Sequence, residues 1–238
     1  MVKRNLTSLL RSNSIFLSLS LMLLIALGLA LLLIPKGDLH LALCNRHTPA
    51  RDIFYMYYTR VAEWFPYVIC VLILLFGRIG DGCMATAAMI LSGLTTQLFK
   101  HIINAPRPLT WFEQNMPDIQ LPLTEGVRMN YWFSFPSGHT TSFFALALVI
   151  GITGSIFLIE KYPSEKEYQW RNALMQVTLF LFAALGAYSR IYLSQHFATD
   201  IAAGILIGIL ITLLVAWIFG HWESKKWYNY HLIGKKMH

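Results

Sequence analysis

Residues 189–200 form a polar interruption between two long apolar segments and contain residue types suited to phosphate chemistry. His196 and Asp200 are four positions apart, so the carboxylate can orient the imidazole if the following helix has begun by His196. Arg190, which we expect to lie outside the helix, carries a planar guanidinium that suits an oxyanion such as phosphate. The stretch therefore predicts a nucleophile, an acid that orients it and an anion-binding cation.

Two further polar stretches also border hydrophobic segments. Residues 100–108 read Lys-His-Ile-Ile-Asn-Ala-Pro-Arg-Pro, and residues 136–139 read Pro-Ser-Gly-His. Taken alone, a His and an Asp near a membrane helix end are also explained as interfacial polar residues, because short motifs often match by chance. Three such stretches in one chain favour a shared reaction centre.

The composition indicates an integral membrane protein. The chain has 238 residues, of which 56% are hydrophobic and 13% charged, and its mean hydropathy is +0.52. The net charge of +7 is not arranged as a basic stripe interleaved with aromatic residues, so we expect no nucleic-acid partner. Cys44, Cys70 and Cys83 lack metal-ligand spacing, and we interpret them as packing residues.

The hydrophobic pattern predicts one all-α domain over residues 1–238, a polytopic bundle of six transmembrane helices. The first apolar segment, about 22 residues long, can cross a hydrocarbon core of roughly 30 Å. We interpret it as a retained anchor; the competing secretory signal would have a shorter apolar region and a small-x-small cleavage site. An interfacial amphipathic helix is expected from about Asp52, and Pro66 is a candidate kink in the second span. The predicted elements are spans at about residues 14–35, 64–76, 83–99, 137–159, 172–188 and 197–220 and an outer loop at 101–136.

Basic residues predict the orientation. Six spans place both termini on one side, with eleven of the 19 Lys and Arg residues, and the three polar stretches on the other side, with eight. The positive-inside rule then puts the termini in the cytoplasm and the three polar stretches on the periplasmic or outer face of the membrane.

Small residues predict where helices pack closely. Ala88, Ser92 and Thr96 recur every fourth residue up to Lys100, which gives the third span a narrow face for another helix. Gly204 and Gly208 form a small-xxx-small pair in the sixth span. This pair can pack within the bundle or between subunits, and we favour the bundle and a monomer.

The three polar stretches together resemble the signatures of the type 2 phosphatidic acid phosphatase superfamily. Those signatures are K-x6-R-P, P-S-G-H and S-R-x5-H-x3-D, and every position matches in order and with the same internal spacing. The matching residues are Lys100, Arg107, Pro108, Pro136, Ser137, Gly138, His139, Ser189, Arg190, His196 and Asp200. The signatures cover residues 100–200, and the six-span pattern extends the resemblance over nearly the whole chain.

This resemblance implies a role for each polar residue. His196 would attack phosphorus to form a phosphohistidine while Asp200 holds its ring, and His139 would protonate the leaving oxygen and then activate water. The phosphate oxygens would be held by Lys100, Arg107, Ser137, Gly138 and Arg190. The family needs no metal or other cofactor.

Elementary chemistry is consistent with these roles. Phosphoryl transfer depends mainly on positioning and on stabilising charge on the equatorial oxygens, which three cations and a helix N-terminus at Ser137 can supply. Other interpretations stay open: Lys100 and Arg107 as interfacial anchors, Ser137 as a helix start, and His139 as a hydrated interfacial side chain. For His101 we favour a structural role.

The resemblance implies a metal-independent lipid phosphatase acting on a phosphate or diphosphate ester of a membrane lipid. Substrates of similar proteins include lipid A phosphates, undecaprenyl diphosphate, phosphatidic acid and phosphatidylglycerol phosphate, and we favour the first two. The alternatives are a lipid phosphotransferase that uses the same intermediate and a non-catalytic anion transporter. A vanadium haloperoxidase is disfavoured because those proteins are soluble.

Asp118, Glu125 and Arg128 lie in the predicted outer loop. They are candidates for substrate selection or for a solvated loop.

Overall fold

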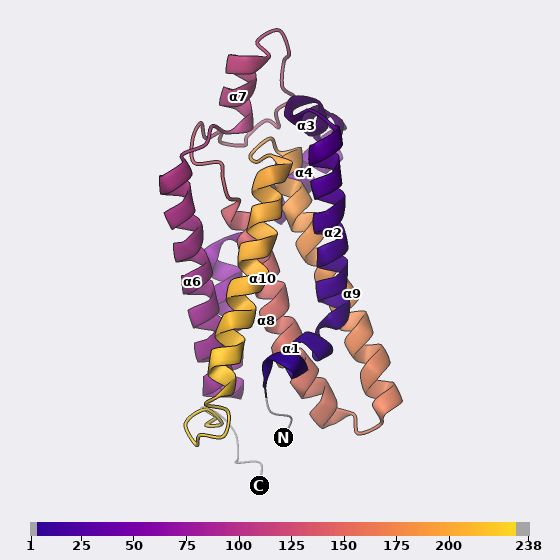
Figure 1. Cartoon of the computed structure of the whole chain (residues 1–238), viewed down its shortest axis with the longest axis vertical. Coiled ribbons are helices and arrows are strands. Elements are labelled where there is room, and N and C mark those ends of the chain that lie inside the picture. The colour runs from indigo at the N-terminus through magenta and orange to yellow at the C-terminus, as the bar shows by residue number, and fades with distance from the viewer. Residues whose placement is uncertain (1–3, 232–238) are drawn as a thin grey trace.

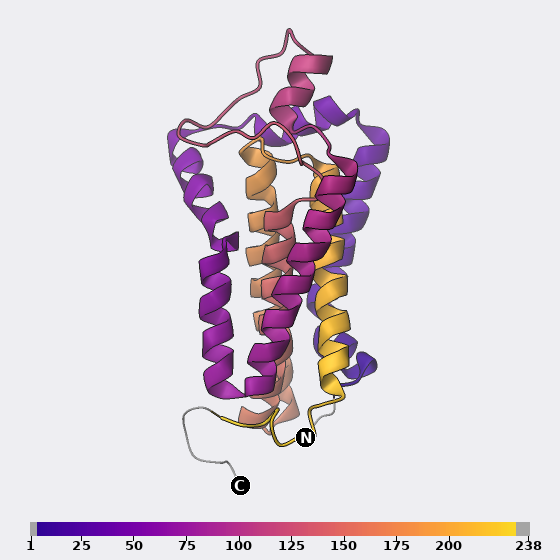
Figure 2. The same ribbon diagram turned by 90° about the vertical axis from the view of Figure 1, so that its left-hand side faces the viewer.

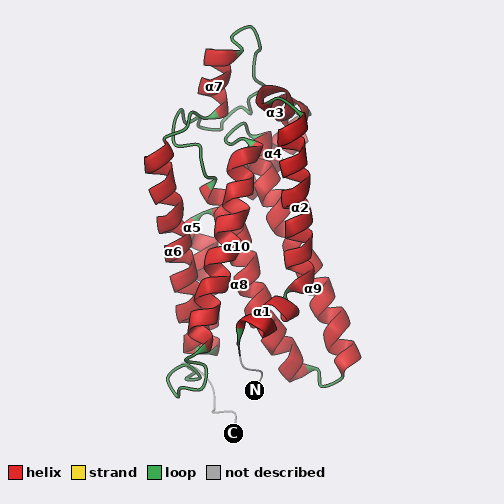
Figure 3. Cartoon of the chain, viewed as in Figure 1, coloured by secondary structure: helices red, strands yellow, loops and turns green. Residues whose placement is uncertain are grey.

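The computed structural model of the chain describes residues 4–231, and these residues form helices joined by loops, without strands (Figures 1 and 3). The helices are α1 (Leu6–Ser12), α2 (Ser14–Leu33), α3 (Lys36–Cys44), α4 (Pro49–Tyr58), the 3-10 helix η1 (Thr59–Ala62), α5 (Trp64–Gly77), α6 (Ile79–Ile103), α7 (Pro108–Asn115), α8 (Gly138–Lys161), α9 (Glu165–Tyr192) and α10 (Ala198–Gly220).

The spans confirm the predicted all-α, multi-pass architecture. Within the described residues, α2, α6, α8, α9 and α10 are each long and apolar enough to cross a membrane. A sixth span arises if the pair made by α4 with η1 and by α5, bent by 45°, crosses as one unit. The 45° bend lies at the break between Ala62 and Phe65, directly before the predicted kink at Pro66. Pro66 itself is in the first turn of α5, where its missing N–H has no intrahelical partner to lose.

Several helices extend beyond the apolar segments that predicted them. Arg78 alone separates α5 from α6, because α6 already begins at Ile79, before the predicted start of the third span at about residue 83. The long polar segment contains α7, and α9 continues through Arg190, which was expected outside a helix. An apolar run marks only the hydrocarbon-crossing part of a helix, whereas backbone hydrogen bonds continue through charged residues that also favour helix.

Helix α8 lies at the centre of the bundle and packs against α6, α9 and α10 (Figures 1 and 2). Close contact with α10 requires its glycines: a Cβ at Gly204 would lie 2.7 Å from the Ser137 carbonyl oxygen, and one at Gly208 would lie 2.7 Å from that of Thr141. The glycine pair therefore packs within the bundle, as predicted, and draws the start of α10 onto the start of α8.

The small face of α6 also packs as predicted. Ala88, Ser92, Thr96 and Lys100 are all buried, and the Thr96 hydroxyl donates to that of Thr141 on α8 at 3.3 Å. This contact places the end of α6, and with it Lys100, beside the first turn of α8.

The two ends of the bundle differ. Figure 1 shows the N- and C-terminal segments at one end and α3, α4 and α7 at the other. We call the end with the termini the inner end and the opposite one the outer end. The starts of α8 and α10 and the end of α9 lie at the outer end.

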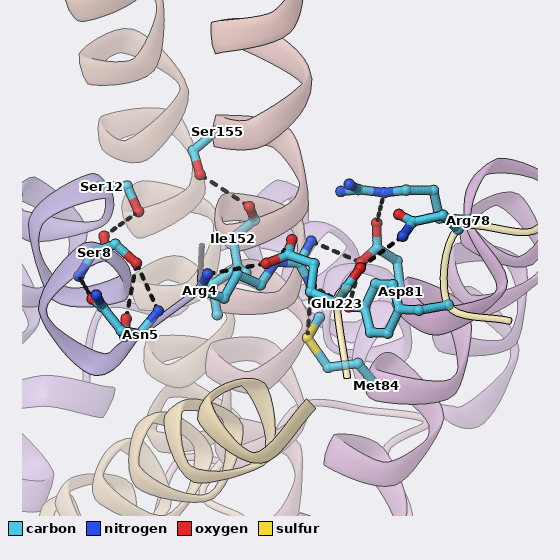
Figure 4. A network of polar contacts seen from close by, with 12 residues as sticks. Arg4, Asn5, Ser8, Ser12, Arg78, Asp81, Met84, Ile152, Ser155 and Glu223 are labelled. Atoms are coloured by element: carbon cyan, nitrogen blue, oxygen red, sulfur yellow. Dashed lines mark hydrogen bonds and ion pairs between the residues drawn. The ribbon is translucent and has the colours of Figure 1, made fainter. Parts of the chain in front are cut away.

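A buried ion network closes the inner end (Figure 4). Arg4 pairs with Asp81 at 2.7 Å and with Glu223 at 3.4 Å, and Arg78 binds the other oxygen of Asp81 at 2.9 Å. The Tyr228 hydroxyl accepts from Arg4 and donates to Asp81. We call Arg4, Asp81, Glu223 and Tyr228 the terminal clasp, because they join both terminal segments to the start of α6.

Candidate active site

The three polar stretches meet at the outer end around His139. This side chain, in the first turn of α8, lies within electrostatic range of Arg190, His196, Arg107 and Lys100. Helices α6, α8 and α9 and the segments before α7 and α10 thus contribute to one site. The structure brings together the three cations and two histidines of the polar stretches.

The proposed nucleophile lies in a turn rather than a helix. Residues 193–197, the nucleophile turn, connect α9 to α10, whose first residue is Ala198. The expectation that a helix has begun by His196 is therefore wrong. The Asp200 carboxylate nevertheless reaches the imidazole, as predicted, because His196 Nδ1 lies 3.3 Å from Asp200 Oδ2.

Asp200 can reach His196 because it also caps α10. Its Oδ2 atom accepts the backbone N–H of Phe197 at 3.0 Å, which satisfies a free donor of the first helical turn. The Ser134 hydroxyl donates to the same oxygen at 2.5 Å, and Thr199 donates to the other oxygen at 3.2 Å. The carboxylate, 3% exposed, is thereby fixed from several sides as an acceptor for the imidazole.

The surroundings of His196 keep its imidazole neutral. Burial lowers its pKa from 6.5 to about 3, outweighing the hydrogen bond to Asp200 that raises it, and the charges of Arg107 and Arg190 lower it further. Because Asp200 accepts at Nδ1, that nitrogen carries the proton and the lone pair of Nε2 is free. A neutral imidazole with a free Nε2 is the form that can attack phosphorus.

The three cations are held by neutral acceptors. Lys100 Nζ donates to the Phe133 carbonyl at 2.6 Å, and Arg190 donates to the Thr59 hydroxyl at 2.7 Å. Arg107 donates to the Trp132 carbonyl and, at 3.1 and 3.2 Å, to the side-chain and backbone oxygens of Gln195. Within residues 4–231, none of the three forms an ion pair with a carboxylate, although each is at most 9% exposed.

The start of α8 completes the site. Ser137 caps the helix by accepting the backbone N–H of Thr140, and its own N–H donates to the Asp200 carbonyl at 3.0 Å, which joins the second polar stretch to the third. Gly138 lies beside Lys100: a Cβ there would be 4.0 Å from Lys100 Cε. A helix N-terminus facing buried cations is a favourable place for a tetrahedral anion.

Sequence comparison agrees with this geometry. The model of the PAP2 superfamily matches residues 81–224, more than half of the chain and all three polar stretches. The chain belongs to the PAP2 superfamily. The prediction of family is confirmed.

Individual PAP2 relatives cover different shares of the chain. A lipid A 4'-phosphatase from Porphyromonas gingivalis is 40% identical over 75 residues, which are 32% of this chain and 25% of that protein. The aligned stretch thus spans a quarter of that relative. The crystal structure of Aquifex aeolicus LpxE has a TM-score of 0.56 and 24% identity, covering 76% of this chain and 94% of the other. The crystal structure of a transmembrane PAP2-type phosphatidylglycerolphosphate phosphatase from Bacillus subtilis has a TM-score of 0.51 and 20% identity, covering 91% of this chain and 98% of the other. The two structures share the PAP2 fold with this chain.

Two residues of the site are not fixed positions of the PAP2 signatures and were missed in the sequence. Gln195 occupies a variable position of the third signature yet binds Arg107, and its Nε2 atom also reaches the Arg128 carbonyl at 3.4 Å. Ser134 binds Asp200. In the sequence, Gln195 stands out only as a polar residue directly before His196, and Ser134 only as a polar residue between two phenylalanines. Neither position has a spacing that predicts its partner.

The remaining candidates lie apart from the cations. His101 is exposed and packs edge-on against Phe133 at 5.2 Å, consistent with a structural role. Asp118, Glu125 and the Arg128 side chain are exposed on the outer loop. Among the described residues, no group of three or more His, Cys, Asp or Glu side chains is placed to hold a metal ion.

Proposed function

We propose that this PAP2 protein is a membrane lipid phosphatase, a phosphoric ester hydrolase that works through a phosphohistidine on His196. The observation that carries the proposal is the set of three buried cations, without carboxylate partners in the described chain, around a neutral histidine fixed by Asp200. Family membership and the partial match to a lipid A 4'-phosphatase support the same reaction class.

In the first half-reaction, Nε2 of His196 attacks phosphorus and the bond from phosphorus to the lipid oxygen breaks. His139 donates a proton to that leaving oxygen, while Asp200 stabilises the positive charge that develops on the imidazole of His196. In the second half-reaction, His139 takes a proton from water, the water oxygen attacks phosphorus, and the bond to Nε2 breaks. Lys100, Arg107, Arg190 and the start of α8, with Ser137 and Gly138, stabilise the equatorial oxygens in both steps.

A groove beside the site suits a lipid substrate. It has a volume of about 410 Å³, and its lining includes Ala62 and Tyr67, Met89 and Gly93 of α6, and Ser142 of α8. Glu63, also in the lining, lies within electrostatic range of Arg190, so the groove runs close to the proposed phosphate site. Its mostly apolar wall can hold part of a hydrocarbon chain while the head group reaches His196.

The favoured substrates are lipid A and undecaprenyl diphosphate. Both are amphiphiles whose phosphate is presented at a membrane surface, and the partial match to a lipid A 4'-phosphatase supports the first. The distribution of basic residues supports an inner-membrane location, with the termini in the cytoplasm and the site facing the periplasm. We propose hydrolysis without a metal, by a protein that acts as a monomer.

Phosphate release in detergent micelles tests the function. Purified protein is given lipid A, undecaprenyl diphosphate, phosphatidic acid and phosphatidylglycerol phosphate, each with and without EDTA. We expect release from at least one lipid, unchanged by EDTA and reduced at least about 10³-fold by His196→Ala. His221→Phe, an exposed change at the inner end, is the matched control and should have the wild-type rate. Wild-type turnover by His196→Ala would defeat the mechanism, and a product carrying phosphate on an added acceptor lipid would identify a phosphotransferase.

A further inference from the structure

Helix α3 presents a polar stripe to the nucleophile turn. Lys36, His40 and Cys44 are spaced by four residues and lie on one helix face. The His40 ring packs 5.1 Å from that of Phe197, and Lys36 Nζ lies 3.9 Å from the centre of the Phe197 ring. This stripe lies outside residues 81–224 that match the PAP2 model, and the proposed chemistry assigns it no role.

His40 binds the turn directly. Its side chain is 2% exposed, and its Nε2 atom lies 3.3 Å from the Ser194 hydroxyl oxygen. Ser194 donates its own proton to the Pro122 carbonyl at 3.4 Å, and a carbonyl can only accept. The Ser194 oxygen is therefore the acceptor and His40 Nε2 the donor.

The protonation state of His40 agrees with this assignment. Burial lowers its pKa to about 4, with Asp200 raising it and Lys36 lowering it further, so the ring is neutral at pH 7. Its Nδ1 atom has no partner within the described residues. With the proton on Nε2, Nδ1 is an acceptor without a donor, which proteins tolerate better than an N–H donor without an acceptor.

The backbone conformation of Ser194 sets the positions of the two residues that follow it in the turn. It adopts a left-handed backbone conformation, with φ of 49°. The next two residues both donate their backbone N–H groups to the Arg190 carbonyl, Gln195 at 2.9 Å and His196 at 3.2 Å. Because Gln195 in turn binds Arg107, a shift at Ser194 would displace the nucleophile and one of the cations together.

We propose that His40 is a positioning residue for the reaction: by donating to Ser194 it holds the nucleophile turn so that His196 is aimed at phosphorus and Gln195 holds Arg107. The inference rests on the proposed phosphatase function. His40 itself does not touch the substrate, so its removal should slow turnover more than it weakens substrate binding.

Two substitutions at one position separate the hydrogen bond from packing. His40→Phe keeps a ring but removes the donor, and we expect kcat about tenfold lower with KM changed less than about threefold, the size expected for one lost hydrogen bond. His40→Gln can place its amide nitrogen near the position of Nε2, and we expect kcat within about threefold of wild type. Wild-type kcat in His40→Phe, or an equal loss in both variants, would overturn the inference.

Ser194→Ala tests the partner without adding volume, and it carries the test if His40→Phe fails to fold. Ser194→Ala also removes the bond to the Pro122 carbonyl, so we expect a loss of kcat at least as large as for His40→Phe. The double variant should lose no more than Ser194→Ala alone, because both changes remove the bond between His40 and Ser194. Losses that multiply in the double variant would show independent roles and reject the proposal.

Orthovanadate binding supplies a readout without turnover, because a five-coordinate vanadate on the nucleophile resembles the transition state rather than the bound substrate. Its affinity is measured from the ligand-induced rise in Tm, and we expect about tenfold weaker binding in His40→Phe than in wild type and His40→Gln. Equal affinity in all three proteins would overturn the positioning role. Wild-type protein that binds vanadate but releases no phosphate from any lipid would instead count against the proposed function.

Discussion

The two ends of the bundle use buried charge in opposite ways. In the terminal clasp, Arg4 lies between two carboxylates, Asp81 and Glu223, and Arg78 reaches one of them as well. At the outer end, Lys100, Arg107 and Arg190 are also buried, but among the described residues they bind carbonyl, amide and hydroxyl oxygens rather than carboxylates. Paired charges hold chain segments together, whereas cations left without a counter-ion raise the local positive potential and suit an anionic ligand.

Buried Asp is used differently at the two ends, and exchanging it for Asn gives the sharpest contrast. Asp200→Asn should lower kcat by about 10²- to 10⁴-fold, because an amide can favour the wrong imidazole tautomer of His196, with a smaller effect on KM. Asp81→Asn, the matched change in the clasp, should lower Tm while leaving kcat of the folded protein within about twofold. Phosphate release and thermal unfolding are measured on both. Equal losses in binding and turnover for Asp200→Asn would argue against an orienting role.

Replacing a buried Arg by Met should change stability in opposite directions at the two ends. Arg4→Met leaves Asp81 and Glu223 without their cation and should cost about 3–5 kcal/mol of stability. Arg190→Met removes a buried charge that has no carboxylate partner within residues 4–231, so stability should stay the same or rise by about 1–2 kcal/mol while turnover falls sharply. Denaturant or thermal unfolding in detergent measures the difference. A large loss of stability in Arg190→Met would mean that the outer cations are structural.

The smallest expected effect is on the pH dependence of stability. In the folded protein the pKa of His196 is about 3, whereas an unfolded His has 6.5, so below about pH 6.5 the unfolded state binds a proton that the folded state does not. The free energy of unfolding should therefore fall as the pH is lowered from about 6.5 towards 4. Above about pH 6.5, His196 should make stability neither rise nor fall with pH, because it is neutral in both states. His196→Gln removes it, so its Tm should fall less between pH 7 and 5 than that of wild type. Parallel Tm curves for the two proteins would contradict the neutral, buried state of His196.

Most residues of the candidate site could be named from the sequence, because the spacing of Lys100 with Arg107 and of His196 with Asp200 matches the PAP2 signatures. The local geometry was less predictable. His196 lies in a turn and Arg190 in a helix, opposite to the sequence-based expectation, because the capping of α10 by Asp200 and the extension of α9 depend on neighbours in space.

The sequence alone determined the all-α membrane architecture, the three polar stretches and the family, since apolar runs of bilayer length and motifs of fixed spacing are written in consecutive residues. Only the tertiary structure decided that Ser134 holds Asp200, that Gln195 holds Arg107 and that His40 reaches Ser194. Each of these pairs is separated by 66 to 154 positions. Such contacts arise when helices pack, so no local pattern of residues can specify them.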